Sequence, residues 1–370
     1  MIKHPKIAVV SPVPLVESYI NKNPMSVPVI LKKMGYDSVI FATGNELKGR
    51  PELPKVVLYD GGYKMGTTLN PIAQLKYALT LNKLVKQERP DAVLFFIDTL
   101  AAAFLKLMNP KVKMIITADI EHDSFDKMPY PKPLIWLSFL VKELVGTILI
   151  TQTNYNYNMT VSFAPFTRKK LRVVRCPVYE RFFLKDGEGN TREKIILCVA
   201  RITPVKRQDL LVAAFGEIAD KYPDWKLRFV GMIENKSYFN SIKQQISNLK
   251  LEKRIEFAFY IPDSKIREEY LRASIFCLPS DRESPAAVRG EAMAMGVPVV
   301  TTATVGSEYV EGKGTVVPVN DKQGLAKGLE RYMSDPRARV DASKKEKKFA
   351  EEKLRDTKVI GYLISQINRK

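Results

Sequence analysis

Two glutamates eight positions apart mark the part of the sequence best suited to chemistry. Glu283 follows the apolar run 273–278, which predicts a buried strand, and Ser284 and Pro285 are a favoured cap and first helical position. Glu291 then lies a little over two turns along the predicted helix, about 12 Å at ~1.5 Å per residue, so both carboxylates can face one cleft. Taken alone, an ordinary amphipathic helix with both glutamates facing water explains this spacing better.

The start of the same predicted helix offers unpaired backbone amides. Those of Ala286, Ala287 and Val288 are the first free N–H groups, and the helix dipole favours an anion beside them. Residues 296–300 then end the helix on glycine and begin another buried strand. The whole segment therefore predicts a strand, helix and strand of a parallel sheet.

Cations and a histidine follow other predicted strands. Arg201 and Lys206 flank the turn after strand 194–199, and a guanidinium with a nearby ammonium suits a pyrophosphate. His122, one of only two histidines, follows strand 112–117, at the end of a strand where open sheets bind ligands. Solvated turn residues, and a histidine that bonds only its own loop, are the alternatives. A metal site is not expected, because no second histidine lies near His122.

The segment from Glu283 to Val299 resembles the nucleotide-sugar site of the family-four retaining glycosyltransferases, which are group 1 glycosyl transferases with the two-domain GT-B fold. Their signature is Glu, seven residues, Glu, then Ala-Met-Ala-x-Gly-x-Pro-Val, and this chain carries all of it. It departs after the first glutamate, where Ser284-Pro285-Ala286 replaces the usual Gly-Phe-Gly. Because proline removes an amide and narrows the backbone's freedom, we expect the phosphate and sugar contacts of this turn to differ in detail.

The resemblance extends to the other candidate residues. Family members commonly have Gly-Arg, four residues, Lys-Gly at the first turn of the second domain, and here Arg201 and Lys206 remain while Ala200 and Arg207 replace the glycines. His122 matches a histidine that many members carry after the corresponding strand of the first domain. The order of these motifs along the chain is the order in the family.

This resemblance implies roles at the donor sugar. Glu283 and Ala286 would contact the sugar, and Glu291 would hold the ribose hydroxyls. His122 would reach the donor sugar and the leaving phosphate from across the cleft. We therefore predict His122 and Glu283 as the catalytic residues.

The resemblance also implies how the leaving group is stabilised. Arg201 and Lys206, with the amides of Ala287 and Val288, would meet the negative charge that develops on the diphosphate. Related enzymes need no metal, and we expect no cofactor besides the nucleotide-sugar co-substrate.

The alternation of strands and helices predicts an α/β fold with two Rossmann-like, doubly wound domains facing a cleft. The exposed linker composition of 185–190 places an acceptor-side domain at 1–186 and a nucleotide-sugar domain at 187–356, with a helix at 357–370 that crosses back to the first domain in GT-B proteins. No glycine lies between Met1 and Met34, so Ser11, Pro14 or the 21–23 tract would line the acceptor side.

Charge and composition narrow the partners. The 59 basic and 40 acidic residues favour anionic partners such as nucleotide diphosphates, nucleic acid or an acidic membrane surface. Nucleic acid is not expected, because no helix-turn-helix, metal-finger or RNA-binding motif is present. The three cysteines predict buried free thiols and a reducing compartment. No export signal is visible, so we expect a cytoplasmic protein. Association with the inner face of the membrane is the alternative.

The apolar run 131–150 resembles a membrane span at first sight. Lys142, Glu143 and Gly146 divide it into a core helix, 134–145, and a strand, 148–151, each too short to cross a bilayer. Exposed parts of Ile135, Trp136 and Phe139 could still contact an anionic membrane peripherally.

We therefore predict a retaining, metal-independent glycosyltransferase that moves a sugar from a UDP- or GDP-linked donor to an unidentified glycan, lipid-linked or small-molecule acceptor. The alternative is a non-catalytic protein on the same fold that binds nucleotide sugars or anionic surfaces. Donor-dependent release of nucleotide diphosphate separates the two hypotheses.

Overall fold

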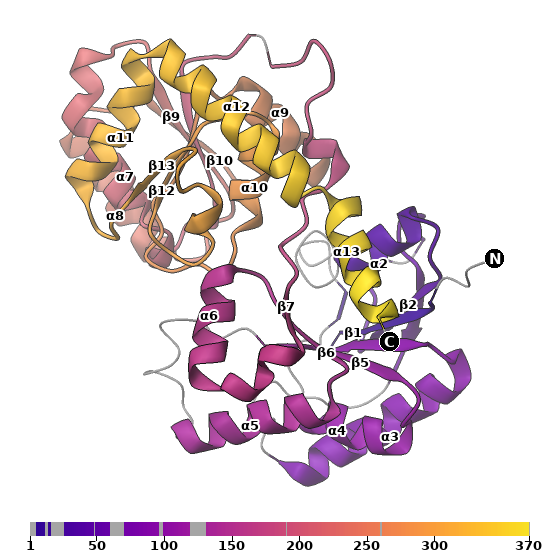
Figure 1. Cartoon of the computed structure of the whole chain (residues 1–370). Coiled ribbons are helices and arrows are strands. Elements are labelled where there is room, and N and C mark those ends of the chain that lie inside the picture. Colours follow the sequence, from indigo (N-terminus) through magenta and orange to yellow (C-terminus); the bar gives the residue numbers. More distant parts are fainter. Residues whose placement is uncertain are drawn as a thin grey trace. The chain divides into compact units, whose positions relative to one another are not determined.

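The computed structural model describes residues 5–11, 14–15, 26–47, 49–59, 70–95, 99–118, 131–189, 191–259 and 261–369. The chain forms two compact units (Figure 1). The N-terminal unit comprises residues 1–177 and 356–370, and the C-terminal unit comprises residues 178–355.

The described part of the N-terminal unit contains one parallel sheet of seven strands in the order β3-β2-β1-β4-β5-β6-β7. Its strands are almost wholly apolar, as expected where helices cover both faces. The strands are β1 (Ile7–Val10), β2 (Ser38–Ala42), β3 (Lys55–Leu58), β4 (Ala92–Phe95), β5 (Lys113–Thr117), β6 (Ile148–Thr151) and β7 (Leu171–Val173).

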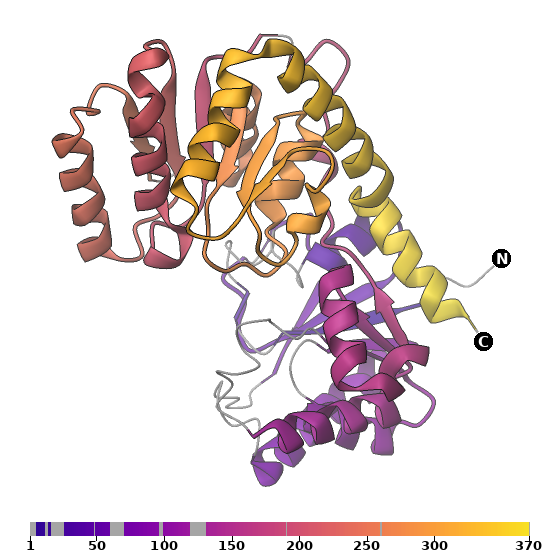
Figure 2. The same ribbon diagram turned by 60° about the vertical axis from the view of Figure 1, so that its left-hand side comes forward.

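Helices lie on both sides of this sheet (Figures 1 and 2). On one side α3, α4 and α5 pack next to one another and share a core with alternate residues of the strands. On the other side α2 contacts the C-terminal helix α13. The helical segments are α2 (Ser26–Lys33), α3 (Pro71–Glu88), α4 (Thr99–Met108), α5 (Lys132–Val145), α6 (Asn154–Phe163), η2 (Pro165–Lys169) and α13 (Asp356–Asn368).

Polar contacts attach α13 to the N-terminal unit although it is the last segment of the chain. Lys33 of α2 forms an ion pair of 3.2 Å with the buried Asp356 at the start of α13. At the other end of the helix, Lys113 donates to the carbonyl of Ile367 and Arg172 donates to Gln366. These contacts supplement an apolar helix face that is buried along its length.

The described part of the C-terminal unit contains a parallel sheet of six strands in the order β10-β9-β8-β11-β12-β13. In Figure 1, α7, α8 and α11 lie on one side of it and α9, α10 and α12 on the other, and each group shares its own apolar core with the sheet. The strands are β8 (Ile195–Val199), β9 (Lys226–Val230), β10 (Ile255–Ala258), β11 (Ile275–Leu278), β12 (Val299–Thr302) and β13 (Thr315–Val317). The helices are α7 (Gln208–Ile218), α8 (Lys236–Asn248), α9 (Ile266–Arg272), α10 (Ala287–Ala294), α11 (Lys322–Ser334) and α12 (Pro336–Lys353), with short 3-10 segments η3 (Glu180–Phe182), η4 (Pro204–Lys206), η5 (Ala219–Lys221), η6 (Asp263–Lys265) and η7 (Ser307–Tyr309).

The two sheets confirm the predicted fold class of two Rossmann-like, doubly wound domains. The structure divides the chain after Pro177, whereas the sequence placed the first boundary at 186/187. Val178, Phe182 and Phe183 lie in the apolar core of the C-terminal unit, so they belong to that unit although they precede the linker-like segment. The second division follows Arg355.

The apolar run 131–150 forms α5 and β6, as predicted, and none of the described helices is long and apolar enough to cross a membrane. All three cysteines are buried free thiols, as expected from their isolated positions. Ile135 and Phe139 are buried, so the expectation that they could contact a membrane is wrong, whereas Trp136 is exposed. Helical periodicity explains this difference, because Ile135 and Phe139 are four residues apart on the face of α5 that packs against the sheet.

Candidate functional site

The candidate residues of the C-terminal unit lie where the order of its strands reverses. β8 and β11 are adjacent in the sheet, and the chain leaves them toward opposite neighbours, β9 and β12. The loops after β8 and β11 therefore meet at the carboxyl edge of the sheet, where open α/β sheets bind ligands. Arg201 and Lys206 lie in the first loop, and Glu283 lies in the second.

Lys206 and Glu283 form an ion pair between these two loops. The Nζ of Lys206 lies 2.6 Å from Oε1 of Glu283, and the two side chains are 16% and 7% exposed. The same carboxylate oxygen accepts a hydrogen bond of 2.6 Å from the hydroxyl of the buried Ser280. Thr302 of β12 in turn donates to the carbonyl of Ser280 at 2.6 Å. Glu283 is thus held in one orientation, with a cation beside it.

Arg207 joins the same two loops from the far end of the first. Its Nη1 lies 3.0 Å from Oδ1 of Asp281, and its Nε lies 3.1 Å from Oδ1 of Asp209. The backbone amide of Asp281 also donates to the carbonyl of Val205 at 2.9 Å. Arg207 adopts a left-handed conformation with φ 49°, which favours glycine. This conformation suits the glycine that the family resemblance implies at this position, and here two carboxylates hold an arginine in it.

Arg201 is the more exposed cation of the first loop. Its side chain is 54% exposed and forms an ion pair with Glu234. The loop at Ala200 and Arg201 runs directly against Gly231, whose φ is 150°, and a Cβ there would lie 2.1 Å from the carbonyl oxygen of Ala200. Gly231 is therefore required for the close approach of the turns after β8 and β9. The structure places Arg201 and Lys206 on one loop, but each has its own carboxylate partner.

The N-terminus of α10 differs from its prediction. The sequence predicted a helix that begins at Pro285 with Ser284 as cap, but α10 begins at Ala287, and its cap residue Ala286 provides no side-chain hydrogen bond. The amide of Arg289 donates to the carbonyl of Ala286 at 3.1 Å. The prediction of Ser284 as the cap was wrong, since the buried Pro285 still belongs to the loop. The amides of Ala287 and Val288 nonetheless begin the helix, as expected for an anion site.

Arg289 is a buried residue of this site that the sequence analysis missed. Its guanidinium donates to Oγ1 of Thr301 at 3.0 Å, to the carbonyl of Val305 at 2.8 Å and to the hydroxyl of Thr304. No carboxylate in the described part of the chain forms an ion pair with it. Burial lowers the pKa of Arg289 to about 10, and the nearby Glu283 opposes that shift, so the side chain stays charged at neutral pH.

Two consequences follow from this buried cation. It fastens the segment after β12 to the first turn of α10, and it adds a permanent positive charge next to that helix end. The signal in the sequence was a single charge between two glutamates in an otherwise apolar helix. That signal alone does not distinguish a buried arginine from a solvated one.

Glu291 is partly buried, which differs from the solvent-facing position that the sequence suggested. Its Oε2 accepts a hydrogen bond of 2.8 Å from the hydroxyl of Tyr270, which is fully buried on α9. Burial, with the adjacent charge of Glu291, raises the pKa of Tyr270 well above its ordinary value, so the phenol remains a donor. Glu291 is therefore oriented by the protein and supports the structure as well.

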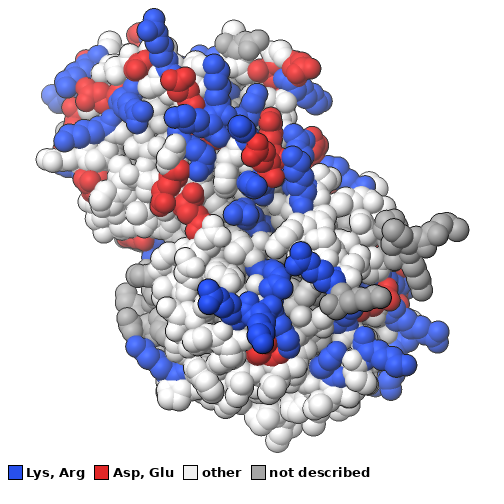
Figure 3. Space-filling model, viewed as in Figure 1, with Lys and Arg blue, Asp and Glu red and all other residues white. Residues whose placement is uncertain are grey.

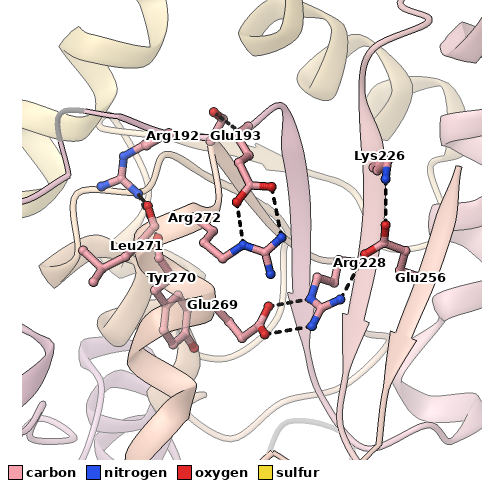
Figure 4. Close-up of polar contacts among 10 residues, drawn as sticks. Arg192, Glu193, Lys226, Arg228, Glu256, Glu269, Tyr270, Leu271 and Arg272 are labelled. Carbon is pink, nitrogen blue, oxygen red and sulfur yellow. Dashed lines mark hydrogen bonds and ion pairs between the residues drawn. The ribbon is translucent and has the colours of Figure 1, made fainter.

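A network of ion pairs fixes α9, and with it Tyr270 (Figure 4). Arg228 of β9 holds Glu269 through two nitrogens, at 2.5 and 2.8 Å, and also contacts Glu256 of β10. Arg272 holds Glu193 in the same two-pronged way at 2.5 and 3.0 Å. α9 is thus attached to β9 and to the segment that leads into β8, and these contacts lie away from the candidate site.

The candidate residues of the first domain lie partly outside the described residues. His122 and residues 21–23 lie outside the described residues. Ser11 is buried. Its amide donates to the carbonyl of Phe41 and its carbonyl accepts a hydrogen bond from the hydroxyl of Tyr59, so its backbone groups stabilise the sheet. Pro14 is exposed. Among the described residues no group of three histidine, cysteine or carboxylate side chains is arranged to hold a metal ion.

Comparisons with known proteins agree with this architecture. Residues 180–349 match the family model of the glycosyl transferases group 1. A Haemophilus influenzae protein named "uncharacterized glycosyltransferase" is 26% identical over 334 residues, which cover 87% of this chain and 88% of that protein. A GDP-mannose-dependent phosphatidylinositol monomannoside mannosyltransferase of Mycolicibacterium smegmatis is 29% identical over 173 residues, 44% of this chain and 43% of that protein.

The fold is similar to a solved structure over nearly the whole chain. The Anabaena protein HepE, in complex with UDP and glucose, superposes with a TM-score of 0.76 at 14% identity and covers 98% of this chain and 99% of its own. At this identity the likeness concerns the fold. The family match covers the loops after β8 and β11 together with α10, and it therefore includes Arg201, Lys206, Glu283 and Glu291. We conclude that the segment 180–349 is a group 1 glycosyl transferase domain and that the chain has the GT-B fold.

Proposed function

We propose that the C-terminal unit binds a nucleotide diphosphate sugar and that the chain transfers the sugar with retention of anomeric configuration, without a metal ion. The observation that carries this proposal is the Lys206–Glu283 pair beside the N-terminus of α10. A cation and a helix end without a side-chain cap suit the diphosphate with its leaving oxygens, and a carboxylate suits the sugar hydroxyls.

The diphosphate is the leaving group, and its negative charge grows as the glycosidic bond breaks. Lys206 keeps two N–H groups beyond the one directed at Glu283, and the ammonium does not have to move far to share them with a phosphate. Arg201 can exchange its exposed partner Glu234 for a phosphate at little cost, since surface ion pairs contribute about 0–1 kcal/mol. The fixed charge of Arg289 adds to this field. These cations support metal-independent stabilisation of the leaving group.

Glu283 and Glu291 are the proposed contacts to hydroxyl groups. The hydroxyl of Ser280 orients the first carboxylate toward Lys206, and Tyr270 orients the second. An oriented carboxylate accepts hydrogen bonds from sugar or ribose hydroxyls without losing side-chain freedom on binding. The roles assigned to His122 and Ala286 remain predictions.

The relatives support both a uridine and a guanosine donor. HepE was solved with UDP, and the mycobacterial relative uses GDP-mannose and acts on a phosphatidylinositol mannoside. We propose that the donor is one of these two classes and that the acceptor is a glycan, a lipid-linked sugar or a small molecule.

A donor panel tests the proposal. Thermal unfolding is measured with UDP-glucose, UDP-N-acetylglucosamine and GDP-mannose, each with and without a chelator, since a ligand of the native state raises the unfolding temperature. Release of UDP or GDP is then measured with the donor that protects. We expect protection and release in chelator. Protection that requires magnesium or manganese would contradict the metal-independent proposal. Protection without release of UDP or GDP, whichever acceptor is added, would favour a binding protein.

A further inference from the structure

The helices α3, α4 and α5 of the N-terminal unit expose an unusual number of large apolar side chains. Twelve such side chains are exposed among the described residues of the chain, and seven of them lie on these three helices. Scattered exposed leucines are normal, but a concentration on one side of one unit indicates an interaction surface. The seven residues, which we name the apolar face, are Ile72, Leu75, Leu79, Leu107, Trp136, Leu137 and Leu144.

The apolar face follows the helical repeat. On α3, Ile72, Leu75 and Leu79 are spaced by three and four residues, so they form one stripe on the side opposite the buried Tyr77, Ala78 and Leu81. On α5, Leu137 and Leu144 are seven residues apart and again share a side. α3 and α5 therefore each have two apolar stripes, one packed on the sheet and one facing outward, which is more than folding requires.

The charges of the same helices identify the partner. α3, α4 and α5 contain six lysines and two glutamates. Both glutamates are turned away from the outer side, since Glu88 is paired with Lys6 and Lys55, and Glu143 lies beside Lys170. Four of the lysines are exposed, namely Lys76, Lys83, Lys86 and Lys132.

The outer side of these helices is therefore apolar and basic, with no exposed carboxylate among its described residues. Figure 3 shows the region over α4 and α5 as mostly uncharged, with basic side chains at its margin. A protein partner would normally meet a mixture of charges, whereas apolar side chains flanked only by lysines match the acyl chains and anionic headgroups of a bilayer surface. We infer that the apolar face and its lysines dock the N-terminal unit on an anionic membrane, with the helices lying in the interface. The docking surface is separate from the donor site, and this inference does not depend on the proposed reaction.

Vesicle sedimentation with the full chain tests this inference. Wild type is mixed with vesicles of phosphatidylcholine alone or of phosphatidylcholine with phosphatidylglycerol, at low and high salt. We expect sedimentation with the anionic vesicles that weakens at high salt. Leu144→Ser should weaken binding roughly tenfold, because a leucine that is 73% exposed loses most of its transfer into the interface. Val340→Ser removes an apolar side chain of α12 that is 50% exposed, and it should have no effect.

The lysines have a matched control as well. Lys83→Gln with Lys86→Gln should weaken binding to anionic vesicles several-fold and leave the weak binding to neutral vesicles unchanged. Lys344→Gln with Lys345→Gln removes two exposed charges from α12 and should change little. Thermal unfolding of each variant checks that it is folded. Wild type that stays in solution with anionic vesicles, or equal losses in the variants and their controls, would overturn the inference. A stable dimer that Leu144→Ser dissociates would do the same, since it would assign the apolar face to a second copy of the chain.

Discussion

Replacing Lys206 by methionine tests whether its charge binds the donor diphosphate or only stabilises the fold. Methionine retains most of the length of the side chain and removes the ammonium. The lysine is 16% exposed, and among the described residues its ion-pair partner is Glu283, which is 7% exposed. The change therefore leaves a nearly buried carboxylate without its cation, and it removes the positive charge that we propose for the diphosphate.

The structure sets the size of both effects. Breaking a fully buried ion pair costs about 3–5 kcal/mol, but Glu283 keeps the hydroxyl of Ser280 at 2.6 Å and retains some contact with water. We therefore expect a loss of about 1–2 kcal/mol in the free energy of unfolding of the C-terminal unit. In donor turnover, a lost charged contact to a developing anion should cost at least ~2 kcal/mol, about thirtyfold in kcat/KM.

A double-mutant cycle with Glu283→Gln distinguishes the two roles. The double variant contains neither buried charge, so its urea denaturation midpoint should return toward that of wild type. Its kcat/KM for the donor should remain at least as low as that of Lys206→Met, because neither the cation nor the carboxylate is restored. If stability and kcat/KM recover together in the double variant, Lys206 serves only the fold and our placement of the diphosphate is wrong.

Three further predictions concern residues around the site and the core of the same unit. Glu291→Ala should lower the free energy of unfolding by about 1–3 kcal/mol because it leaves the buried hydroxyl of Tyr270 with only a long contact of 3.4 Å to the carbonyl of Val288, whereas Glu291→Gln should lose little; equal denaturation midpoints for the two variants would contradict this contact. Arg207→Ala should have a free energy of unfolding about 1 kcal/mol lower than Arg207→Gly in urea denaturation, because alanine is strained at φ 49° and glycine is not. Identical midpoints would refute the strain argument. Burial raises the pKa of Glu346 well above its ordinary 4.5, so the folded state holds this proton more tightly than the unfolded state and loses stability as pH rises from 4.5 through the raised value. Glu346→Gln cannot titrate, and its unfolding temperature relative to wild type should be higher at about pH 8 than at about pH 5. A constant difference would show that the pKa of Glu346 is not raised in the folded protein.

The alternation of short apolar runs with amphipathic segments was sufficient to predict two Rossmann-like domains. The strands predicted at 112–117, 148–151, 194–199 and 273–278 lie within about two residues of β5, β6, β8 and β11, since parallel strands covered on both faces are apolar throughout and end at polar turns. The motif around Glu283 and the cations Arg201 and Lys206 were also predictable from the sequence. Each group lies within its own strand-to-helix connection, so its spacing is a local property of the chain. The division of the apolar run 131–150 into α5 and β6 followed from three residues within it.

The start of α10 could not be predicted, because Ser284 and Pro285 satisfy the local rules for a helix start and only packing in the folded unit keeps them in the loop. The ion pair of Lys206 with Glu283 joins the loops that follow β8 and β11. Lys206 and Glu283 are 77 positions apart, and no local pattern indicates that they share a hydrogen bond.

What the sequence determined by itself was therefore the set of elements and the chemical groups at their ends. The tertiary structure decided which of those groups are buried and which of them meet. Arg289 became a buried cation because β12 and the segment after it supply it with three oxygen acceptors, and Glu291 became a structural residue because α9 brings a buried phenol to it. Burial and pairing depend on contacts between segments that are distant in the chain, and the free energy of a charge depends on those contacts far more than on its neighbours in sequence.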